Sequence, residues 1–414
     1  MKIIYLTPSG RIGGAERALT GLIASLRTAR PEWRMEVVAG SDGELIGAAR
    51  DLGAGARVLP FPSVLARLGD AGAGGPAGAQ MYPATALMRT VLAAPSTALY
   101  ALRLRRMLRA AAPSVIHSNG LKMHLIASWA APRGVPVLWH IHDYVSARPV
   151  MMPLLRAHAR RCAVAVANST SVAEDLRAAC GGRFPIFPIH YAIDLERFSP
   201  FGPVIDLDEA AGLDPPSTPV VRVGLVATMA RWKGHQVFLR ALARLPQDVA
   251  VRGYVIGGPL YATRGSQYEV DELRRMAKEL GLEGRVGFTG FIGDAAGVMR
   301  ALDIVVHAST EAEPFGLVIA EAMGCGRAVI ASPLGGAAEL ISPGIDALVH
   351  EPGSAASLAA RIEELARDPA RRAALGARAV ESARERFSLA RLARQIAPVY
   401  ERIAKAAERC ESSI

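Results

Sequence analysis

The sequence is poor in cysteine and has no hydrophobic run long enough to cross a membrane. Its four cysteines, Cys162, Cys180, Cys325 and Cys410, lie far apart. This spacing fits neither a disulfide framework nor a zinc site, so we expect reduced thiols in a cytoplasmic protein. The first residues, MKIIYLTPSG, lack the apolar core of a signal peptide. With 51% apolar and 21% charged residues, the chain is expected to fold as a globular protein.

Acidic residues are nearly absent from one long stretch. Between Ala71 and Ala173, eleven basic residues face a single acid, Asp143. This excess equals the net charge of the entire chain, which is +10. A one-sided field of this kind attracts anions, such as phosphates, nucleic acid or an acidic membrane. A genome that prefers arginine would explain the choice of base but not the missing acids.

Short β-branched runs alternate with helical stretches rich in Ala, Leu and Arg, which is typical of parallel βαβ units. The pattern predicts an α/β protein with two Rossmann-like, doubly wound domains and an interdomain cleft at the strand ends. The expected strands are Ile3–Thr7, Met35–Ala39, Arg57–Leu59, Val115–His117, Val137–His140, Val164–Ala167, Ile186–Ile189, Val220–Ala227, Tyr254–Ile256, Val286–Thr289, Ile304–His307, Val329–Ala331 and Ala347–Val349.

The length of 414 residues suits two domains. We expect an N-terminal, acceptor-side domain at 1–194, a proline-rich linker at 195–219 and a nucleotide-sugar-binding domain at 220–386. A C-terminal helix, 387–414, is expected to pack back toward the first domain. Residues 63–96 contain a Gly- and Ala-rich run, and they predict either a lid or surface anchor or an ordinary helix.

The most specific pattern is Glu313-Pro-Phe-Gly-Leu-Val-Ile-Ala-Glu321, which follows an expected strand and opens a helix. The first backbone NH groups of such a helix are free to bind an anion such as a diphosphate. Ionised carboxylates only accept hydrogen bonds, so Glu313 and Glu321 suit the hydroxyl pairs of sugars. An unpaired carboxylate at Glu321, inside this apolar run, would be costly, which argues against a purely structural acid.

This string resembles the Glu-x7-Glu motif of the family 4 retaining glycosyltransferases, which have the GT-B fold, and the resemblance covers nearly the whole chain. It implies that Glu313 contacts hydroxyls of the donor sugar and that Glu321 binds the ribose hydroxyls of the nucleotide. It also implies that Phe315, Gly316 and Leu317 offer backbone NH groups to the sugar and the diphosphate.

A basic turn follows the first strand of the second half, in Gly224-Leu-Val-Ala-Thr-Met-Ala-Arg231-Trp-Lys233-Gly234. In the resembled family, an arginine after this strand and the lysine of Lys-Gly grip the donor diphosphate. Lys233 matches that lysine. The usual arginine position holds Thr228, and Arg231 lies three residues later. Whether Arg231 replaces the missing arginine is left open, with an ordinary solvated side chain as the alternative.

Two loops of the first half follow strands in the same way. Gly13 and Gly14 lie between a strand and a helix, where paired glycines let the backbone approach a ligand closely. The resemblance places this loop near the donor phosphate and the acceptor, and a plain turn or a dinucleotide-binding loop is the alternative. The resemblance also places a histidine against the donor sugar and diphosphate. We choose His142 first and His140 second, against the alternative of a structural histidine.

Together these patterns predict a retaining, hexosyltransferase-type enzyme that moves a sugar from a nucleotide-diphosphate sugar to an acceptor hydroxyl in polysaccharide, glycolipid or other glycoconjugate biosynthesis. His142, Glu313 and Lys233 are the expected catalytic residues. No acidic pair follows a strand in the proposed donor site, so we expect no metal, and we expect no cofactor. The alternatives are a sugar-nucleotide epimerase of the same architecture and a non-enzymatic protein that binds membrane surfaces or nucleic acid.

The basic stretch 71–173 lies within the domain that the resemblance assigns to the acceptor. Helical spacing at Leu99–Arg109 gives an apolar face and a basic face, as in an interfacial helix. We therefore expect peripheral membrane contact through 71–173, at the cytoplasmic face, and a lipid-linked or anionic acceptor, with no nucleic acid. A helix packed into the core with solvated arginines is the alternative.

Overall fold

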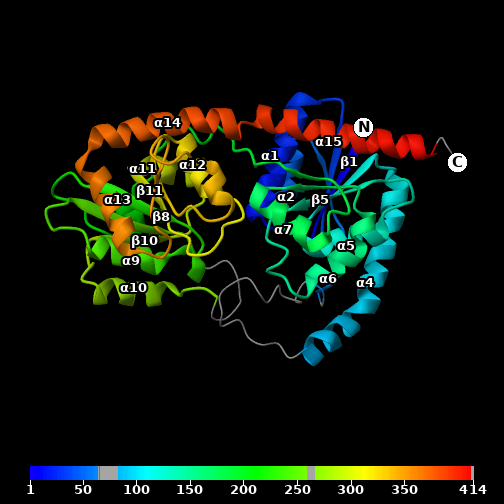
Figure 1. Cartoon of the computed structure of the whole chain (residues 1–414), viewed down its shortest axis with the longest axis horizontal. Coiled ribbons are helices and arrows are strands. Elements are labelled where there is room, and N and C mark those ends of the chain that lie inside the picture. The colour runs from blue at the N-terminus through cyan, green and yellow to red at the C-terminus, as the bar shows by residue number, and fades with distance from the viewer. Residues whose placement is uncertain (64, 66–82, 259–265, 412–414) are drawn as a thin grey trace. The chain divides into compact units, whose positions relative to one another are not determined.

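A computed structural model of the chain describes residues 1–63, 65, 83–258 and 266–411 (Figure 1). The described residues form two compact units. The first unit contains the described residues up to Ala192 and those from Leu389 onward, and the second unit contains Ile193–Ser388. Residues 195–219, expected as a linker, lie within the second unit and include the short helix α8 (Leu207–Ala211).

The first unit is built on a parallel sheet of seven strands in the order β3-β2-β1-β4-β5-β6-β7. The order reverses between β1 and β4, as in a doubly wound fold. The strands are β1 (Lys2–Thr7), β2 (Arg34–Ala39), β3 (Gly55–Val58), β4 (Val115–Asn119), β5 (Val137–Ile141), β6 (Val164–Ala167) and β7 (Ile186–Pro188). The helices are α1 (Gly14–Ala29), α2 (Glu44–Asp51), α4 (Pro83–Ala111), α5 (Leu121–Ala130), α6 (Met151–His158), α7 (Thr170–Cys180) and α15 (Leu389–Glu411), and a single 3-10 turn, η1 (Ala159–Arg161), follows α6.

Both faces of this sheet are buried. Ile3 and Tyr5 of β1 belong to one core, and Ile4 and Leu6 belong to the other, because successive side chains of a strand point to opposite faces. This burial explains the continuous apolar runs of the sequence. Helix α15 packs beside α1 and fills the first of these cores, so the C-terminal helix completes the first unit (Figure 1).

The apolar face of α4 is not available to a membrane. Tyr100, Leu104 and Leu108 are buried in the core under the sheet, so the helix fits the core-packed alternative and the interfacial reading of its apolar face was wrong. Leu99 and Leu102, however, are 50% and 56% exposed, and they share the outer face with exposed arginines of the same helix. Residues 66–82 lie outside the described part of the chain.

The second unit has a parallel sheet of six strands in the order β10-β9-β8-β11-β12-β13, and this order reverses between β8 and β11. The strands are β8 (Val221–Val226), β9 (Val251–Ile256), β10 (Val286–Gly290), β11 (Ile304–His307), β12 (Ala328–Ala331) and β13 (Leu348–Val349). Besides α8, the helices are α9 (His235–Ala243), α10 (Val270–Glu279), α11 (Ala295–Ala301), α12 (Leu317–Gly324), α13 (Ala355–Arg367) and α14 (Pro369–Phe387), with 3-10 turns η2 (Arg231–Lys233) and η3 (Gly336–Leu340). All thirteen expected strands are therefore present, and the α/β, doubly wound fold class is confirmed.

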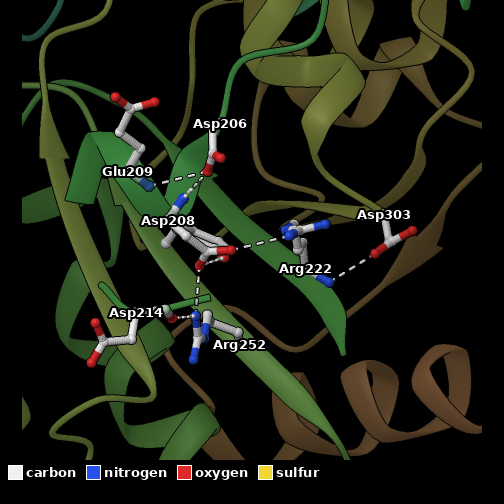
Figure 2. A network of polar contacts seen from close by, with 8 residues as sticks. Asp206, Asp208, Glu209, Asp214, Arg222, Arg252 and Asp303 are labelled. Carbon is white, nitrogen blue, oxygen red and sulfur yellow. Dashed lines mark hydrogen bonds and ion pairs between the residues drawn. The ribbon is translucent and has the colours of Figure 1, made fainter. Parts of the chain in front are cut away.

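Helix α8 is fixed to the second sheet by one buried carboxylate (Figure 2). Asp208 accepts hydrogen bonds from Arg222 at 3.0 Å, from Arg252 at 2.7 Å and from the Tyr254 hydroxyl at 2.6 Å. Burial alone would raise the pKa of Asp208, but these three donors outweigh it and lower the pKa below its usual value. Asp206 caps α8 by accepting from two backbone NH groups of the helix.

Candidate active site

Lys233 and Glu313 lie on the two loops that flank the point where the second sheet reverses its strand order. Lys233 ends η2 after β8, and Glu313 follows β11. Because β8 and β11 are paired neighbours, both loops leave the same carboxyl edge. Lys233 Nζ donates to the two carboxylate oxygens of Glu313 at 2.8 and 2.6 Å. Open α/β sheets bind their ligands at this kind of position.

A glycine allows the two loops to meet. Gly234 has a φ of +77°, and a Cβ atom there would lie 1.9 Å from the carbonyl oxygen of Ala308. Only a residue without a side chain fits so close to another backbone. On the same side, Thr310 donates its backbone NH to the Trp232 carbonyl at 2.8 Å. The turn after β8 is thus seated directly on the loop after β11, and Lys233 is held beside Glu313.

Glu313 is buried and kept ionised by its neighbours. The Ser309 hydroxyl donates to its carboxylate at 2.9 Å, and His307 Nε2 lies 3.2 Å from the same oxygen. Burial alone would raise the pKa of Glu313, but the Lys233 ammonium and the His307 hydrogen bond outweigh it and hold the pKa well below its usual range. Glu313 is therefore a pure hydrogen-bond acceptor at neutral pH.

The first turn of α12 lies next to this carboxylate in the chain. Gly316 has a φ of +95° and directly precedes α12, which begins at Leu317, and Phe315 is buried. The first NH groups of a helix have no partner within it, so this turn is suited to an anion. Glu321 lies one turn further along and is only 6% exposed.

The loop that holds Glu313 is tied to a third loop, which follows β12. Glu313 forms a parallel bridge with Gly335, and Gly336 donates its NH to the Glu313 carbonyl at 2.7 Å. The loops after β8, β11 and β12 therefore meet around one carboxylate. The Lys233 and Glu313 patterns, 80 residues apart in the sequence, are brought to one place.

Arg231 is directed to another partner. Its guanidinium donates to both carboxylate oxygens of Glu272 on α10, at 3.0 to 3.1 Å, and lies 4.4 Å from the centre of the Tyr268 ring. The structure therefore does not bring Arg231 together with Lys233 and Glu313. A diphosphate that binds Arg231 must compete with this bidentate ion pair to Glu272.

In the first unit, the Glu16 side chain caps the start of α1, which begins at Gly14 and has Gly13 as its N-cap residue. Glu16 accepts from the Gly13 NH and from the Thr7 hydroxyl, both at 3.2 Å. Burial raises the pKa of Glu16. Its carboxyl group satisfies donors at the start of α1, so a phosphate bound there would have to displace it.

His142, in the loop after β5, has both ring nitrogens in hydrogen bonds. Asn119 Oδ1, at the end of β4, contacts Nε2, and the Tyr191 hydroxyl lies 2.5 Å from Nδ1. Because an amide oxygen only accepts, Nε2 carries the proton and Nδ1 accepts from Tyr191. Burial and the neighbouring histidines hold the pKa of His142 well below its usual value. The side chain is a neutral imidazole that is fixed in one tautomer.

A chain of polar side chains continues from this histidine into the core. The His140 and His142 ring centres lie 4.2 Å apart. His140 Nδ1 is 3.2 Å from His117 Nε2, and His117 Nδ1 is 2.6 Å from the hydroxyl of Tyr400 on α15. Burial lowers the pKa of His140 to about 3. His140, our second choice for the site, therefore has a structural position behind His142.

An Asp-x-Asp sequence does occur outside the proposed donor site, at Asp206-Leu207-Asp208. Its carboxylates cap α8 and bind Arg222 and Arg252, as described above (Figure 2). Among the residues that the structure describes, no group of three or more His, Cys, Asp or Glu side chains is arranged to hold a metal ion. None of the helices in that part of the chain is long and apolar enough to span a bilayer.

Comparison with known families agrees with this geometry. The model of the family described as Glycosyltransferase Family 4 matches residues 12–197, and that of Glycosyl transferases group 1 matches residues 219–382. The chain belongs to the family 4 glycosyltransferases. In this family 4 glycosyltransferase the first match ends just beyond the boundary between the two units, which lies between Ala192 and Ile193, and the second match lies within the second unit.

Curated relatives match the chain over part of its length. The D-inositol 3-phosphate glycosyltransferase of Mycobacterium sp. (strain JLS) is 36% identical over 159 residues, which are 38% of this chain and 34% of the relative. The protein of the same name from Mycolicibacterium gilvum is 38% identical over 165 residues, 39% of this chain and 35% of the relative. The matched part thus spans about a third of the length of these relatives.

Solved structures match the chain over nearly its full length. HepE from Anabaena, crystallised in complex with UDP, has a TM-score of 0.76 and 26% identity over 97% of this chain and 100% of its own. The sucrose-phosphate synthase of Thermosynechococcus elongatus has a TM-score of 0.69 and 21% identity over 98% of this chain and 100% of its own, and it supports the fold alone. The GT-B fold expected from the sequence is therefore confirmed.

Sequence reasoning missed the residues that support Glu313 in this family 4 glycosyltransferase. His307 is the last residue of β11, and Ser309 lies two residues beyond it. Both lie at the carboxyl end of the strand that leads to Glu313, which is the position where ligand-site residues of a parallel sheet gather. A reading of every strand end, rather than of motifs alone, would have found them.

Proposed function

We propose that the chain is a retaining glycosyltransferase that moves a sugar from a nucleoside diphosphate sugar to an acceptor hydroxyl. The observation that carries this proposal is the Lys233–Glu313 pair at the reversal point of the second sheet, next in sequence to the first turn of α12. HepE, which is 26% identical, was also crystallised with UDP-glucose. A uridine diphosphate hexose is therefore the first donor to test.

Lys233 and α12 have complementary parts in this reaction. As the bond between the sugar and the diphosphate breaks, negative charge grows on the leaving phosphate. An ammonium group and free helix NH groups stabilise such charge most when they are fixed in place beforehand. Lys233 is fixed by Glu313 and by the turn at Gly234, so little rearrangement is needed when the donor arrives.

The two glutamates orient the donor by accepting hydrogen bonds. Glu313 is held ionised by Lys233, His307 and Ser309, and an ionised carboxylate is a pure acceptor suited to hydroxyl groups of the sugar. Glu321 is assigned to the ribose hydroxyls. Its position on α12, one turn after the first helical residue Leu317, supports a role in binding close to the diphosphate.

In the first unit, the neutral His142 is assigned to hydrogen bonding with the donor rather than to charge neutralisation, and its Nε2–H group must then exchange the Asn119 oxygen for an oxygen of the donor. The acceptor oxygen bonds to the anomeric carbon on the face from which the diphosphate leaves, and the hydroxyl proton passes to the departing phosphate oxygen. The anomeric configuration is thus retained without a protein nucleophile. Because Lys233 and the helix supply the positive charge, we propose that transfer needs no divalent metal.

We further propose an anionic or lipid-linked acceptor in glycoconjugate biosynthesis. The basic stretch 71–173 supports contact with an anionic membrane surface, at the cytoplasmic face, since its single acid, Asp143, is already bound by Arg148. The field of this stretch favours negatively charged partners.

A panel of nucleotide sugars tests the donor. Thermal shift and release of the nucleotide diphosphate identify the sugar that binds and turns over, and NMR of the product gives its anomeric configuration. With that donor, we expect Lys233→Met and Glu321→Gln to lower kcat at least about a hundredfold. Lys278→Met removes an equally charged but exposed lysine, at 72% side-chain exposure, and should change kcat less than about twofold.

Each part of the proposal has an outcome that contradicts it. Folded Lys233→Met and Glu321→Gln variants with wild-type turnover would show that the site is misplaced. A product of inverted configuration would refute retention, and loss of turnover in chelator, restored by Mg²⁺ or Mn²⁺, would refute metal independence. If no nucleotide sugar in the panel binds, the transferase proposal itself fails.

A further inference from the structure

The sheet of the first unit has a second edge, opposite the one that carries Asn119 and His142. Residues 131–136 lead into β5, and residues 159–163 lead into β6. The amino ends of parallel strands meet at one edge, so these two segments are neighbours. They lie at the far end of the strands from the residues assigned to sugar transfer.

A cationic pocket of about 510 Å³ lies at this edge. It is lined by arginines from three places in the chain: Arg105 on α4, Arg133 before β5, and Arg160 and Arg161 in η1. Among the described residues, none of these four arginines forms an ion pair with a carboxylate. Four guanidinium groups without acids around one hollow favour a ligand with phosphate groups.

One side of this pocket is formed by Trp129 and His158, which are hydrogen-bonded to each other. Trp129 Nε1 donates to His158 Nε2 at 2.7 Å, and His158 Nδ1 lies 2.8 Å from the Leu154 carbonyl oxygen. Because Nε2 accepts from the indole, Nδ1 donates to that carbonyl. Trp129 is nevertheless 43% exposed, and Leu154 beside it in the fold is 39% exposed. Apolar surface therefore borders the arginines.

An apolar groove of about 390 Å³ adjoins the same two segments. Its lining includes Val164, Phe187, Val399 and Ile403. Gly134 and Ala163 line this groove, while the adjacent Arg133 and the nearby Arg161 line the cationic pocket. An arginine-lined pocket and an apolar groove thus lie at the same end of the strands.

We propose that this edge binds an anionic lipid at a membrane surface, with the phosphate of the headgroup in the arginine pocket and an acyl chain along the groove. An arginine pocket next to an apolar groove favours this ligand, because a free phosphate compound has no apolar part to occupy the groove. A nucleic acid would bind through its phosphates and would likewise leave the groove empty. The inference rests on the membrane contact proposed above but not on sugar transfer. It locates that contact at the strand amino ends, away from the apolar face of α4.

Vesicle sedimentation with the full chain tests the proposal. Binding to phosphatidylcholine vesicles that contain phosphatidylglycerol should exceed binding to phosphatidylcholine alone and should fall with added salt. Arg160→Gln with Arg161→Gln should weaken this binding roughly twenty- to thirtyfold, as expected for two bases at an anionic leaflet. Arg103→Gln with Arg106→Gln removes the same charge from exposed positions of α4 outside the pocket, and it should weaken binding less than about threefold.

A second variant addresses the groove. Ala406 lines it from α15, and Ala406→Glu puts a carboxylate into it at an exposed helical position that tolerates glutamate. Vesicle binding should fall at least about tenfold, because burying the charge against an acyl chain is costly. The donor-induced thermal shift should be unchanged in this variant and in the Arg160/Arg161 variant, which shows that both remain folded.

The possible failures are distinguishable. Equal recovery with neutral and anionic vesicles, or equal losses in the two arginine pairs, would overturn the proposal. Saturable binding of glycerol phosphate without vesicle binding would identify a free phosphate ligand and refute the membrane source. Failure of the nucleotide-sugar panel, with intact vesicle binding, would refute sugar transfer and leave this surface standing.

Discussion

Removal of the Lys233 ammonium should destabilise the second unit by about 3 kcal/mol at neutral pH. Breaking a buried ion pair by removing one partner typically costs about 3–5 kcal/mol. The lower end applies, because Lys233 retains 17% side-chain exposure and Glu313 retains 10%, and because Ser309 and His307 still contact the carboxylate. For a unit of this size, that loss should lower the Tm of Lys233→Met by roughly 6–12 °C.

The pH dependence of this loss has a defined sign. In the wild type, the folded pKa of Glu313 lies below its ordinary value of 4.5, so the pair contributes stability above that value and loses it as pH falls through the folded pKa. Without Lys233, burial should raise the pKa of Glu313, and protonation then relieves the unpaired charge. The gap in Tm between wild type and Lys233→Met should therefore be widest near pH 7 and narrow as the pH falls toward about 4.5.

Thermal unfolding of four proteins checks this reasoning. The double variant Lys233→Met with Glu313→Gln removes both charges while keeping the hydrogen bonds of residue 313. It should recover most of the stability that Lys233→Met loses, and its difference in Tm from the wild type should no longer depend on pH. Lys278→Met disrupts an exposed pair at 3.4 Å and should cost less than about 0.5 kcal/mol. A Lys233→Met variant within about 2 °C of wild type at pH 7, or a gap that does not narrow in acid, would refute the proposed role of the pair.

Two further substitutions test the close backbone contact at Gly234 and the carboxylate that fixes α8 to the second sheet. Gly234→Ala should lower the free energy of unfolding in urea by more than about 2 kcal/mol and should weaken donor binding. The control is Gly353→Ala, at a residue with the same φ of +77° but with open space where the Cβ would lie, and it should lower the free energy of unfolding by only about 1 kcal/mol. Equal losses in the two variants would show that the close contact with Ala308 is unimportant. Asp208→Ala should lower the free energy of unfolding by about 3 kcal/mol, because Arg222 and Arg252 lose their carboxylate partner (Figure 2). Asp214→Ala changes an exposed side chain, and it should alter the free energy of unfolding by less than about 0.5 kcal/mol. Similar melting temperatures of the two variants would contradict this account.

The strands could be predicted because parallel sheets bury both faces. Val164–Ala167 is a continuous apolar run and Ile304–His307 is apolar up to its last residue, and the bounds of both agree with β6 and β11. Where a polar and a small residue interrupt a strand near its start, as Arg252 and Gly253 do in β9, the sequence pattern places the start of the strand too late. The motif at Glu313 could be recognised because a strand end, a glycine and an apolar helix follow one another locally.

Contacts across the fold could not be predicted in this way. That Lys233 binds Glu313 depends on β8 lying next to β11, and alternating strands and helices do not fix this order. The partner of Arg231 lies on α10, so its direction is set by a helix whose packing has no local sequence signal. The apolar side chains of α4 have the same spacing whether they face a core or a membrane, and only the neighbouring elements decide.

The position of α15 has a consequence for synthesis on the ribosome. The core of the first unit needs Leu392, Ile396 and Tyr400, and the Tyr400 hydroxyl also contacts His117, which lies 283 residues earlier in the sequence. The nascent first unit therefore emerges with one apolar face of its sheet uncovered, and residues 193–388 are made before the missing helix appears. At about 5–20 residues per second, this interval is on the order of ten to forty seconds. During this interval the incomplete first unit exposes apolar surface that a chaperone can bind. A stop codon before Leu389 would leave the first unit without a complete core, however well the second unit folds.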